Sequence, residues 1–218
     1  MPSVQLICDY ADRKYPNSET DANKVSDLND IHKRIFVKIA RLKNELEPFE
    51  SVTIANQLTY SLPSDCSVDN IVSVKVSQST TIDTSTEWDE YEFAGLKDDT
   101  TSGYYWGDAG NSKIALLEDD LPISTAGLSI RIFYYRSPNA LSSSNMSAVP
   151  ELDENYHNVL KDLLISELAS QGHNPDTEIA DFRQRKADEF LAEVEENLLK
   201  RYNKAPTVRY TTVREEWG

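Results

Sequence analysis

Residues 21–46 read DANKVSDLNDIHKRIFVKIARLKNEL, and this stretch decides the helical part of the fold. Its apolar positions advance by three or four residues at each step: Leu28, Ile31, Ile35, Ile39, Leu42 and Leu46. That spacing lays one apolar stripe along one side of a helix, so the sequence predicts an amphipathic helix over 21–46. Ser18 and Asp21 fit a capping box at its start, and Pro48 is expected to end it.

The opposite side of this helix carries a dense basic run: Lys33, Arg34, Lys38, Arg41 and Lys43. Two interpretations stay open. The run is either a solvated face that balances nearby acids or a docking face for an acidic neighbour, including another copy of the chain. We take Lys33, Arg34, Lys38 and Arg41 as a candidate subunit-interface surface.

Other helices are predicted at both ends of the chain. A short helix over 6–16 stops before Pro16, and two helices follow Pro150, over 152–170 and 175–203. Gly172 is the expected stop of the first of these two, Asn174 the N-cap of the second and Pro175 its first residue. Such a short break implies an antiparallel pair. The last helix carries a candidate acidic partner or channel face, Glu189, Glu193 and Glu196.

The middle of the chain has the texture of β-structure. Strand-like runs are short, rich in β-branched and aromatic residues, and separated by polar loops at 77–89 and 97–103. They fall at 51–54, 57–62, 72–76, 90–93, 113–117 and 128–135. The predicted fold class is therefore α+β: an antiparallel helical bundle (1–50 and 150–204), a central β-rich insertion (51–149) built on a small antiparallel sheet, and an extended C-terminal arm (205–218).

The arm combines β-branched residues with tyrosine and tryptophan, which tails that remain disordered seldom do. It is either frayed or docked on a partner, where an extended segment adds a strand to a sheet edge. The candidate docking residues are Val208, Arg209, Tyr210, Val213, Arg214 and Trp217.

The net charge of the 218 residues is −15, but it is unevenly spread. Residues 51–150 and 151–200 each carry a net charge of −8, while the last eighteen carry +2. An acidic body disfavours non-specific binding to nucleic acid, which needs clustered Lys and Arg. The charge serves solubility, or it forms a surface past which DNA slides because like charges repel. The apolar share of 39% is low for a self-sufficient globule and favours a protein with much partner-facing surface.

The search for chemistry predicts no enzyme, no cofactor and no metal. Acidic residues cluster around Trp88 (Glu87, Asp89, Glu90 and Glu92) without a convergent partner, and His32, His157 and His173 lack metal-ligand spacing. We expect His32 and His157 on the polar sides of their helices. Cys8 and Cys66 are too few for a disulfide framework, so two reduced thiols are expected. No signal peptide and no membrane helix is predicted.

The order of these parts carries a family resemblance. Its segments are Tyr15-Pro16-Asn17, Asp27–Ile35, Thr59–Asp65, Tyr91–Leu96, Tyr104–Gly107, Ile130–Arg136 and Pro150–His157. Together, over roughly residues 5–203, they resemble the head–tail connector, or adaptor, proteins of tailed bacteriophages.

The resemblance implies a structural protein of the virion neck that is assembled in the host cytoplasm. Its copies would form a ring, commonly of twelve, beneath the portal. A C-terminal segment would bind the portal, and tail or stopper proteins would bind the other end. Double-stranded DNA would pass through without specific binding. The family has no catalytic residues to carry over.

Two other classes compete with this interpretation. An acidic regulator that mimics DNA would occupy the basic cleft of a nucleic-acid enzyme. An enzyme such as a glycan hydrolase would need two of the carboxylates near Trp88 in one pocket.

Overall fold

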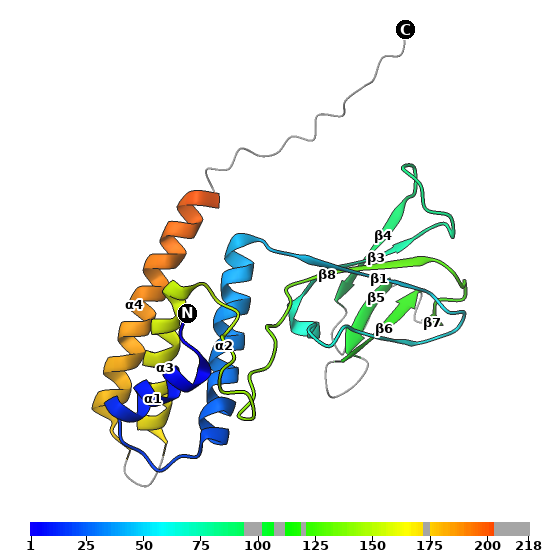
Figure 1. The fold of residues 1–218 in the computed structure, drawn as a ribbon. Coiled ribbons are helices and arrows are strands. Elements are labelled where there is room, and N and C mark those ends of the chain that lie inside the picture. Colours follow the sequence, from blue (N-terminus) through cyan, green and yellow to red (C-terminus); the bar gives the residue numbers. More distant parts are fainter. Residues whose placement is uncertain (94–101, 107–111, 119–120, 172–174, 203–218) are drawn as a thin grey trace.

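In the part of the chain that the structure describes, four helices form one side of the molecule (Figure 1). The computed structural model describes residues 1–93, 102–106, 112–118, 121–171 and 175–202. The helices are α1 (Val4–Lys14), α2 (Asp21–Lys43), α3 (His157–Ser170) and α4 (Thr177–Tyr202), with a 3-10 turn, η2 (Glu154–Tyr156), before α3. Each helix predicted from the apolar spacing is confirmed, although several ends differ.

The starts of α2 and α4 are set by side-chain caps. Thr20 Oγ1 accepts from the Asn23 amide at 3.3 Å, so the expectation that Ser18 caps α2 is wrong. The cap falls two residues later because the side chain of Asn17 accepts the Glu19 amide and turns the chain first. In α4 the carboxylate of Asp176 accepts the Ile179 amide at 3.0 Å. The helix therefore begins at Thr177 rather than at the expected Pro175, while Gly172, His173 and Asn174 lie outside the described residues.

The end of α2 also differs from the prediction. The helix stops at Lys43 because Asn44 adopts the left-handed conformation, with φ of 55°, and its amide and that of Glu45 close back on the last turn. Asparagine tolerates this conformation and is a common helix terminator. Leu46 therefore lies outside the helix. Pro48, the expected stop, lies inside the next element, an edge strand, where proline is tolerated.

The four helices share one hydrophobic cluster. Ile7 of α1, Leu28 and Ile35 of α2, and Leu160 and Leu164 of α3 are almost completely buried in it. A second contact fixes the chain that returns from the strands to α3. The amide side chain of Asn29 donates to the Leu141 carbonyl at 2.9 Å and accepts from the Leu141 amide at 2.7 Å. This returning segment therefore lies against the side of α2 that carries Asn29.

The expectation that His32 and His157 lie on the polar sides of their helices is wrong. Both side chains are buried, at 0% and 1% relative exposure. His32 lies one helical turn from Asn29, on the side covered by the returning segment, and packs edge-to-face on Phe36. His157 lies 3.0 Å from the Leu152 carbonyl through Nε2. Burial lowers the pKa of both imidazoles below the ordinary value.

Eight strands form the other side of the molecule. They are β1 (Glu47–Val52), β2 (Thr59–Ser61), β3 (Ile71–Ser77), β4 (Trp88–Phe93), β5 (Ser102–Trp106), β6 (Lys113–Glu118), β7 (Leu121–Pro122) and β8 (Ser129–Tyr134). A short 3-10 helix, η1 (Val68–Asn70), precedes β3. The mixed α+β class is confirmed. The predicted loop at 97–103 is wrong at its end, because its last two residues form the start of strand β5.

The strands pair in the order β1-β8-β3-β4-β5-β6-β2, with β7 on β6. Strands β1, β8, β3 and β4 form one antiparallel group, and β5, β6, β7 and β2 form another. The two groups meet where β4 pairs with β5 in parallel. The predicted antiparallel pairing is thus confirmed for every described pair except this one.

The alternation expected along β3 holds for two of its three valines. Val74 and Val76 are buried in a second hydrophobic cluster with Ile130, Ile132 and others, but Val72 is 50% exposed because the register shifts between Ile71 and Ser73. The outer face of the same strands carries charge in register: Glu50, Arg131, Lys75 and Glu90 lie opposite one another on β1, β8, β3 and β4.

Two segments connect the helical region (α1–α4) to the β region (β1–β8 with η1): the step from α2 into β1, and the return from β8 to α3 (Figure 1). Side chains of α2 fasten the junction. Arg41 donates to the Asp69 carbonyl and to Asn70 Oδ1 at 3.2 and 3.0 Å. Arg136 pairs with Glu151 at 2.9 Å, and its guanidinium lies 4.7 Å from the Phe36 ring centre. Arg41 thus holds η1 close to α2, and Arg136 holds the returning segment close to Phe36 of the same helix.

Candidate functional site

The described residues contain no arrangement suited to catalysis. Asp89 and Glu90 lie on β4, where they accept hydrogen bonds from Gln78 and Ser73 rather than meeting in a pocket. No group of three His, Cys, Asp or Glu side chains in this part of the chain lies close enough to hold a metal ion. None of the described helices is both long and apolar enough to cross a membrane.

The two cysteines are free and buried. Burial raises the pKa of the Cys8 thiol to about 11 and that of Cys66 to about 12. A thiol with so high a pKa is a poor nucleophile at neutral pH.

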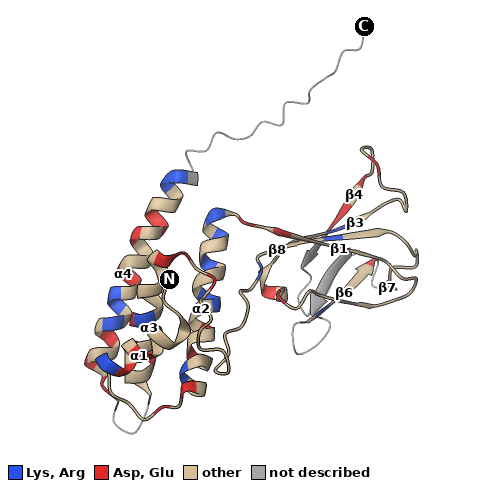
Figure 2. Cartoon of the chain, viewed as in Figure 1, with Lys and Arg blue, Asp and Glu red and all other residues tan. Residues whose placement is uncertain are grey.

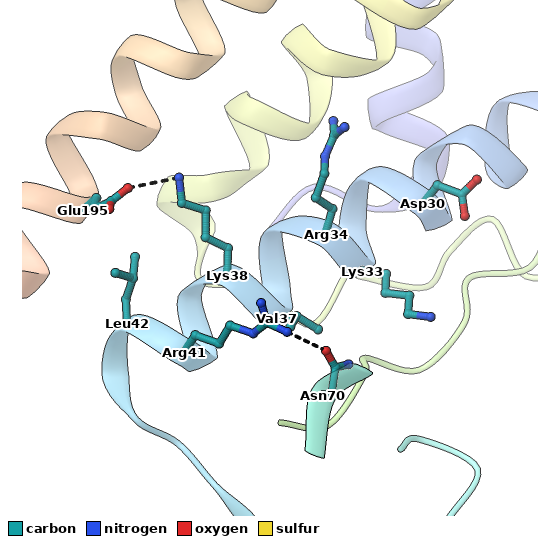
Figure 3. A pocket seen from close by; sticks show the side chains of 9 residues that line it. All are labelled: Asp30, Lys33, Arg34, Val37, Lys38, Arg41, Leu42, Asn70 and Glu195. Carbon is teal, nitrogen blue, oxygen red and sulfur yellow. Dashed lines mark hydrogen bonds and ion pairs between the residues drawn. The ribbon is translucent and has the colours of Figure 1, made fainter. Parts of the chain in front are cut away.

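A groove opens where α2, α4 and η1 come together, and it has a volume of about 690 Å³ (Figure 3). We call it the basic groove. It is lined by Asp30, Lys33, Arg34, Val37, Lys38, Arg41, Leu42, Asn70 and Glu195. All four residues of the predicted basic surface therefore lie in one place. Figure 2 shows the Lys and Arg residues along α2.

The structure separates these four cations into two kinds. Lys38 forms an ion pair with Glu195 of α4 at 3.1 Å, and both side chains are nearly half exposed. Arg41 is held by Asp69 and Asn70, as described above. Both side chains thus serve contacts within their own chain.

Lys33 and Arg34 differ from them. Both are exposed, and neither has a hydrogen-bond or ion-pair partner among the described residues. In Figure 3 their side chains extend away from the two contacts made by Lys38 and Arg41. The same groove is also lined by Val37, which is buried, and by Leu42, which is half-buried. Such a surface binds carboxylates, for which the guanidinium offers a two-pronged geometry.

Arg34 also borders a small hollow of about 310 Å³ lined by Asp27, Asp30 and Glu167 among others. Burial, followed by the charges of Glu167 and Asp30, raises the pKa of Asp27 above its ordinary value. The basic groove therefore has an acidic border on one side.

The predicted acidic surface lies along α4. Glu189, Glu193 and Glu196 are spaced by four and three residues, which places them on one face of the helix. Glu196 forms an ion pair with Lys200, one turn further along. Glu189 and Glu193 are exposed and have no partner among the described residues.

These two glutamates line a second groove, of about 520 Å³, which we call the acidic groove. Its other walls come from α1, α3 and α4: Tyr10, Asn158, Val159, Lys161, Asp162, Lys186, Ala187 and Phe190. Asp162 is buried and pairs with Lys186 at 2.8 Å and with Arg183 at 2.7 Å. Lys161 donates to Asn158 and lies 5.3 Å from the Tyr10 ring centre.

The two grooves open on opposite sides of α4. Glu195 lines the basic groove, and Glu193 lines the acidic groove. Residues two apart in an α-helix are separated by roughly 200° around its axis. Each copy of the chain therefore presents free cations on one side of α4 and free carboxylates on the other.

Sequence reasoning missed Asn70, Tyr10 and Phe190 as groove residues. Asn70 comes from a distant 3-10 helix, for which no signal in the sequence indicates contact with α2. The arm residues Val208, Arg209, Tyr210, Val213, Arg214 and Trp217 lie outside the described residues.

The described residues thus present two grooves with unpaired charges of opposite sign on the two sides of α4. Comparison with protein families is specific: the model of the SU10 adaptor protein family matches residues 4–214, so the chain belongs to that family. The resemblance to phage adaptors is thereby confirmed. The protein is a structural component of a phage virion and contacts other head or tail proteins. A search of the curated proteins finds no match.

Proposed function

We propose that this adaptor forms a homo-oligomeric ring, of twelve copies, that joins the portal to the tail in the virion neck. The observation that carries the proposal is the presence of free cations and free carboxylates on opposite sides of α4. Two different surfaces that match each other produce head-to-tail contacts, and such contacts close into rings when the rotation allows. Assembly takes place in the host cytoplasm.

The basic surface (Lys33, Arg34, Lys38 and Arg41) of one copy faces the acidic surface (Glu189, Glu193 and Glu196) of the next. Electrostatic complementarity of this kind steers encounter and fixes orientation more than it adds affinity. It suits a ring whose subunits must all point the same way.

The fold is proposed to divide along the same lines. Residues 1–50 and 150–204 form the helical bundle and carry the ring contacts, 51–149 form the β-rich insertion, and 205–218 form the docking arm. The two hydrophobic clusters support this division. One cluster is formed by residues of the helices and of the segments packed against them, and the other is formed by residues of the β region.

The channel of the ring conducts double-stranded DNA without binding it specifically. Its support is the charge of residues 51–200, which carry 26 acidic and 10 basic side chains. A surface of that sign repels the phosphate backbone and lets the duplex slide.

The test is electron microscopy of the full chain, alone and mixed with the portal of the same phage. We expect rings seated on the portal. A chain that never associates with portal under assembly conditions would contradict the proposal.

The arm is tested separately by deleting residues 206–218. All described helices and strands lie before this segment, so the truncated chain is expected to keep its far-ultraviolet circular dichroism spectrum. Binding to the portal should be lost. A milder Trp217→Ala variant serves as a second measurement, and unchanged portal binding by both would overturn the docking role of the arm.

A further inference from the structure

We infer that the acidic groove of one copy receives Lys33 and Arg34 of the next copy, between Tyr10 and Phe190 and against Glu189 and Glu193. This inference rests on the proposed ring and names the contact that closes it. It selects two of four basic residues and two of three acidic ones, where sequence alone treats each set as uniform.

The selection on the basic side follows from which cations are free. Lys38 already pairs with Glu195, and Arg41 is engaged by Asp69 and Asn70. Recruiting either one for a neighbour breaks a contact within the chain. Lys33 and Arg34 are exposed and unpaired within the described residues, so they bind a partner without that loss.

The selection on the acidic side follows in the same way. Glu196 pairs with Lys200, whereas Glu189 and Glu193 have no partner in the described part of the chain. The groove contains two lysines of its own, but Asp162 pairs with Lys186, and Lys161 donates to Asn158. Their contacts leave the two glutamates available to cations from outside.

The walls of the acidic groove suit long cationic side chains. Tyr10 is half-buried and already has two lysine ammonium groups near its ring, at 5.9 Å for Lys14 and 5.3 Å for Lys161. Phe190 adds a second half-buried ring. Arginine and lysine lay their aliphatic stems on such rings while their heads meet carboxylates.

The occupant is a second copy because the complementary surface belongs to this chain. The basic groove also carries Val37 and Leu42, which adds apolar area to the charged contact. A two-fold dimer through either groove would bring like charges together, which is costly. The opposite placement of the grooves on α4 therefore favours a head-to-tail contact.

The experiment uses two full-length variants that reverse charge on one side each. The first is Lys33→Glu with Arg34→Glu, and the second is Glu189→Lys with Glu193→Lys. Either variant alone places like charges at every subunit contact. We expect the fraction of chains in rings, measured by mass photometry in the presence of portal, to fall at least about tenfold for each.

Mixing the two variants in equal amounts supplies the decisive result. Wherever the variants alternate, each contact again joins opposite charges, so rings should return in the mixture, with an even number of subunits. A general loss of folding in either variant cannot produce this recovery. Circular dichroism of each variant alone provides the independent check that both are folded.

A charge-matched control places two reversals in the β region, Lys75→Glu with Lys113→Glu. It changes the net charge as much as the first variant does and should leave ring formation within about twofold of the original chain. Rings formed by either groove variant alone, or no rings in the mixture while the original chain forms them, would overturn this contact. Failure of the original chain to assemble would instead contradict the proposed function.

Discussion

The helical region and the β region treat their charges differently. On the outer face of the sheet, Arg131 and Lys75 lie side by side between Glu50 and Glu90, and Arg131 both pairs with Glu50 and lies over the Trp88 ring at 4.4 Å. In the helical region, Lys33, Arg34, Glu189 and Glu193 have no partner among the described residues. Arg131 thus has an ion-pair partner within its own sheet, whereas the four free charges of the helical region can be paired by a neighbouring copy. The comparison supports the proposal that copies contact one another through the helices.

The largest expected effect comes from substitutions in the two hydrophobic clusters, which test whether the helical region and the β region unfold separately. Leu164 is fully buried in the helical cluster and Ile132 is 1% exposed in the β cluster. Leu164→Ala and Ile132→Ala should each cost about 2–5 kcal/mol of unfolding free energy. If the regions unfold as separate units, Leu164→Ala lowers the melting temperature of the helical signal at 222 nm only. Ile132→Ala then lowers the transition seen by near-ultraviolet circular dichroism. An equal shift of one common transition in both variants would show that the regions unfold together.

The next effect concerns the one buried carboxylate of the acidic groove. Asp162→Ala removes the partner of Arg183 and Lys186, and Arg183 is itself mostly buried. An uncompensated, partly buried cation should cost about 2 kcal/mol in urea unfolding. Glu196→Ala, which breaks the exposed pair with Lys200, is the control and should leave the free energy of unfolding nearly unchanged. Equal losses in the two variants would contradict the distinction between the pairs.

The buried histidines make the helical region sensitive to pH. Burial lowers the pKa of His32 in the folded chain, and the opposing charge of Glu151 offsets this only in part; the neighbouring His157 lowers it further. Above the unfolded pKa of about 6.5 both states are neutral and stability is complete. Below it the unfolded chain binds protons first, so stability falls by at most about 1.4 kcal/mol per pH unit for each histidine.

The measurement is the melting temperature of the original chain and of His32→Leu between pH 7.5 and 5.5. Removing one of two buried imidazoles should reduce the pH dependence by about half, since His157 remains. An unchanged slope would show that His32 takes up no proton on unfolding in this range.

The smallest effect tests the junction of the two regions. Arg41→Ala removes two hydrogen bonds to η1 and should cost about 1 kcal/mol, with faster amide hydrogen exchange at Asn70 and Tyr135. Lys38→Ala removes only a pair that is nearly half exposed and should leave this exchange unchanged. Equal amide exchange rates in the two variants would show that Arg41 does not stabilise the junction.

The sequence predicted the helices well because their apolar residues recur every three or four positions. Their ends depended on single side chains: the left-handed Asn44 ends α2 early, and Asp176 starts α4 late. His32 was misplaced because its cover comes from a segment more than a hundred residues away, fixed through Asn29 and Leu141. The spacing of apolar residues within a helix does not indicate that a distant segment buries one of its polar residues.

The same limit applied to the site. The charge pattern located the basic and acidic surfaces on the correct helices, since charge is visible in sequence. It did not distinguish Lys33 from Lys38, because that difference depends on whether Glu195 of another helix is within reach. Tyr10 and Phe190 carry no signal that separates a groove wall from a core position.

The two hydrogen bonds between Asn29 and Leu141 have a mechanical consequence. The chain on either side of the β region is fastened to α2: it leaves the helix covalently at Asn44, and the segment that returns from β8 is bound through Asn29. These points are fifteen residues apart, roughly 22 Å along the helix axis. If the proposed ring conducts DNA, a load applied to the β region reaches α2 at these points and is distributed along the helix. In the proposed ring, the helix that carries Lys33 and Arg34 would pass this load from one copy to the next.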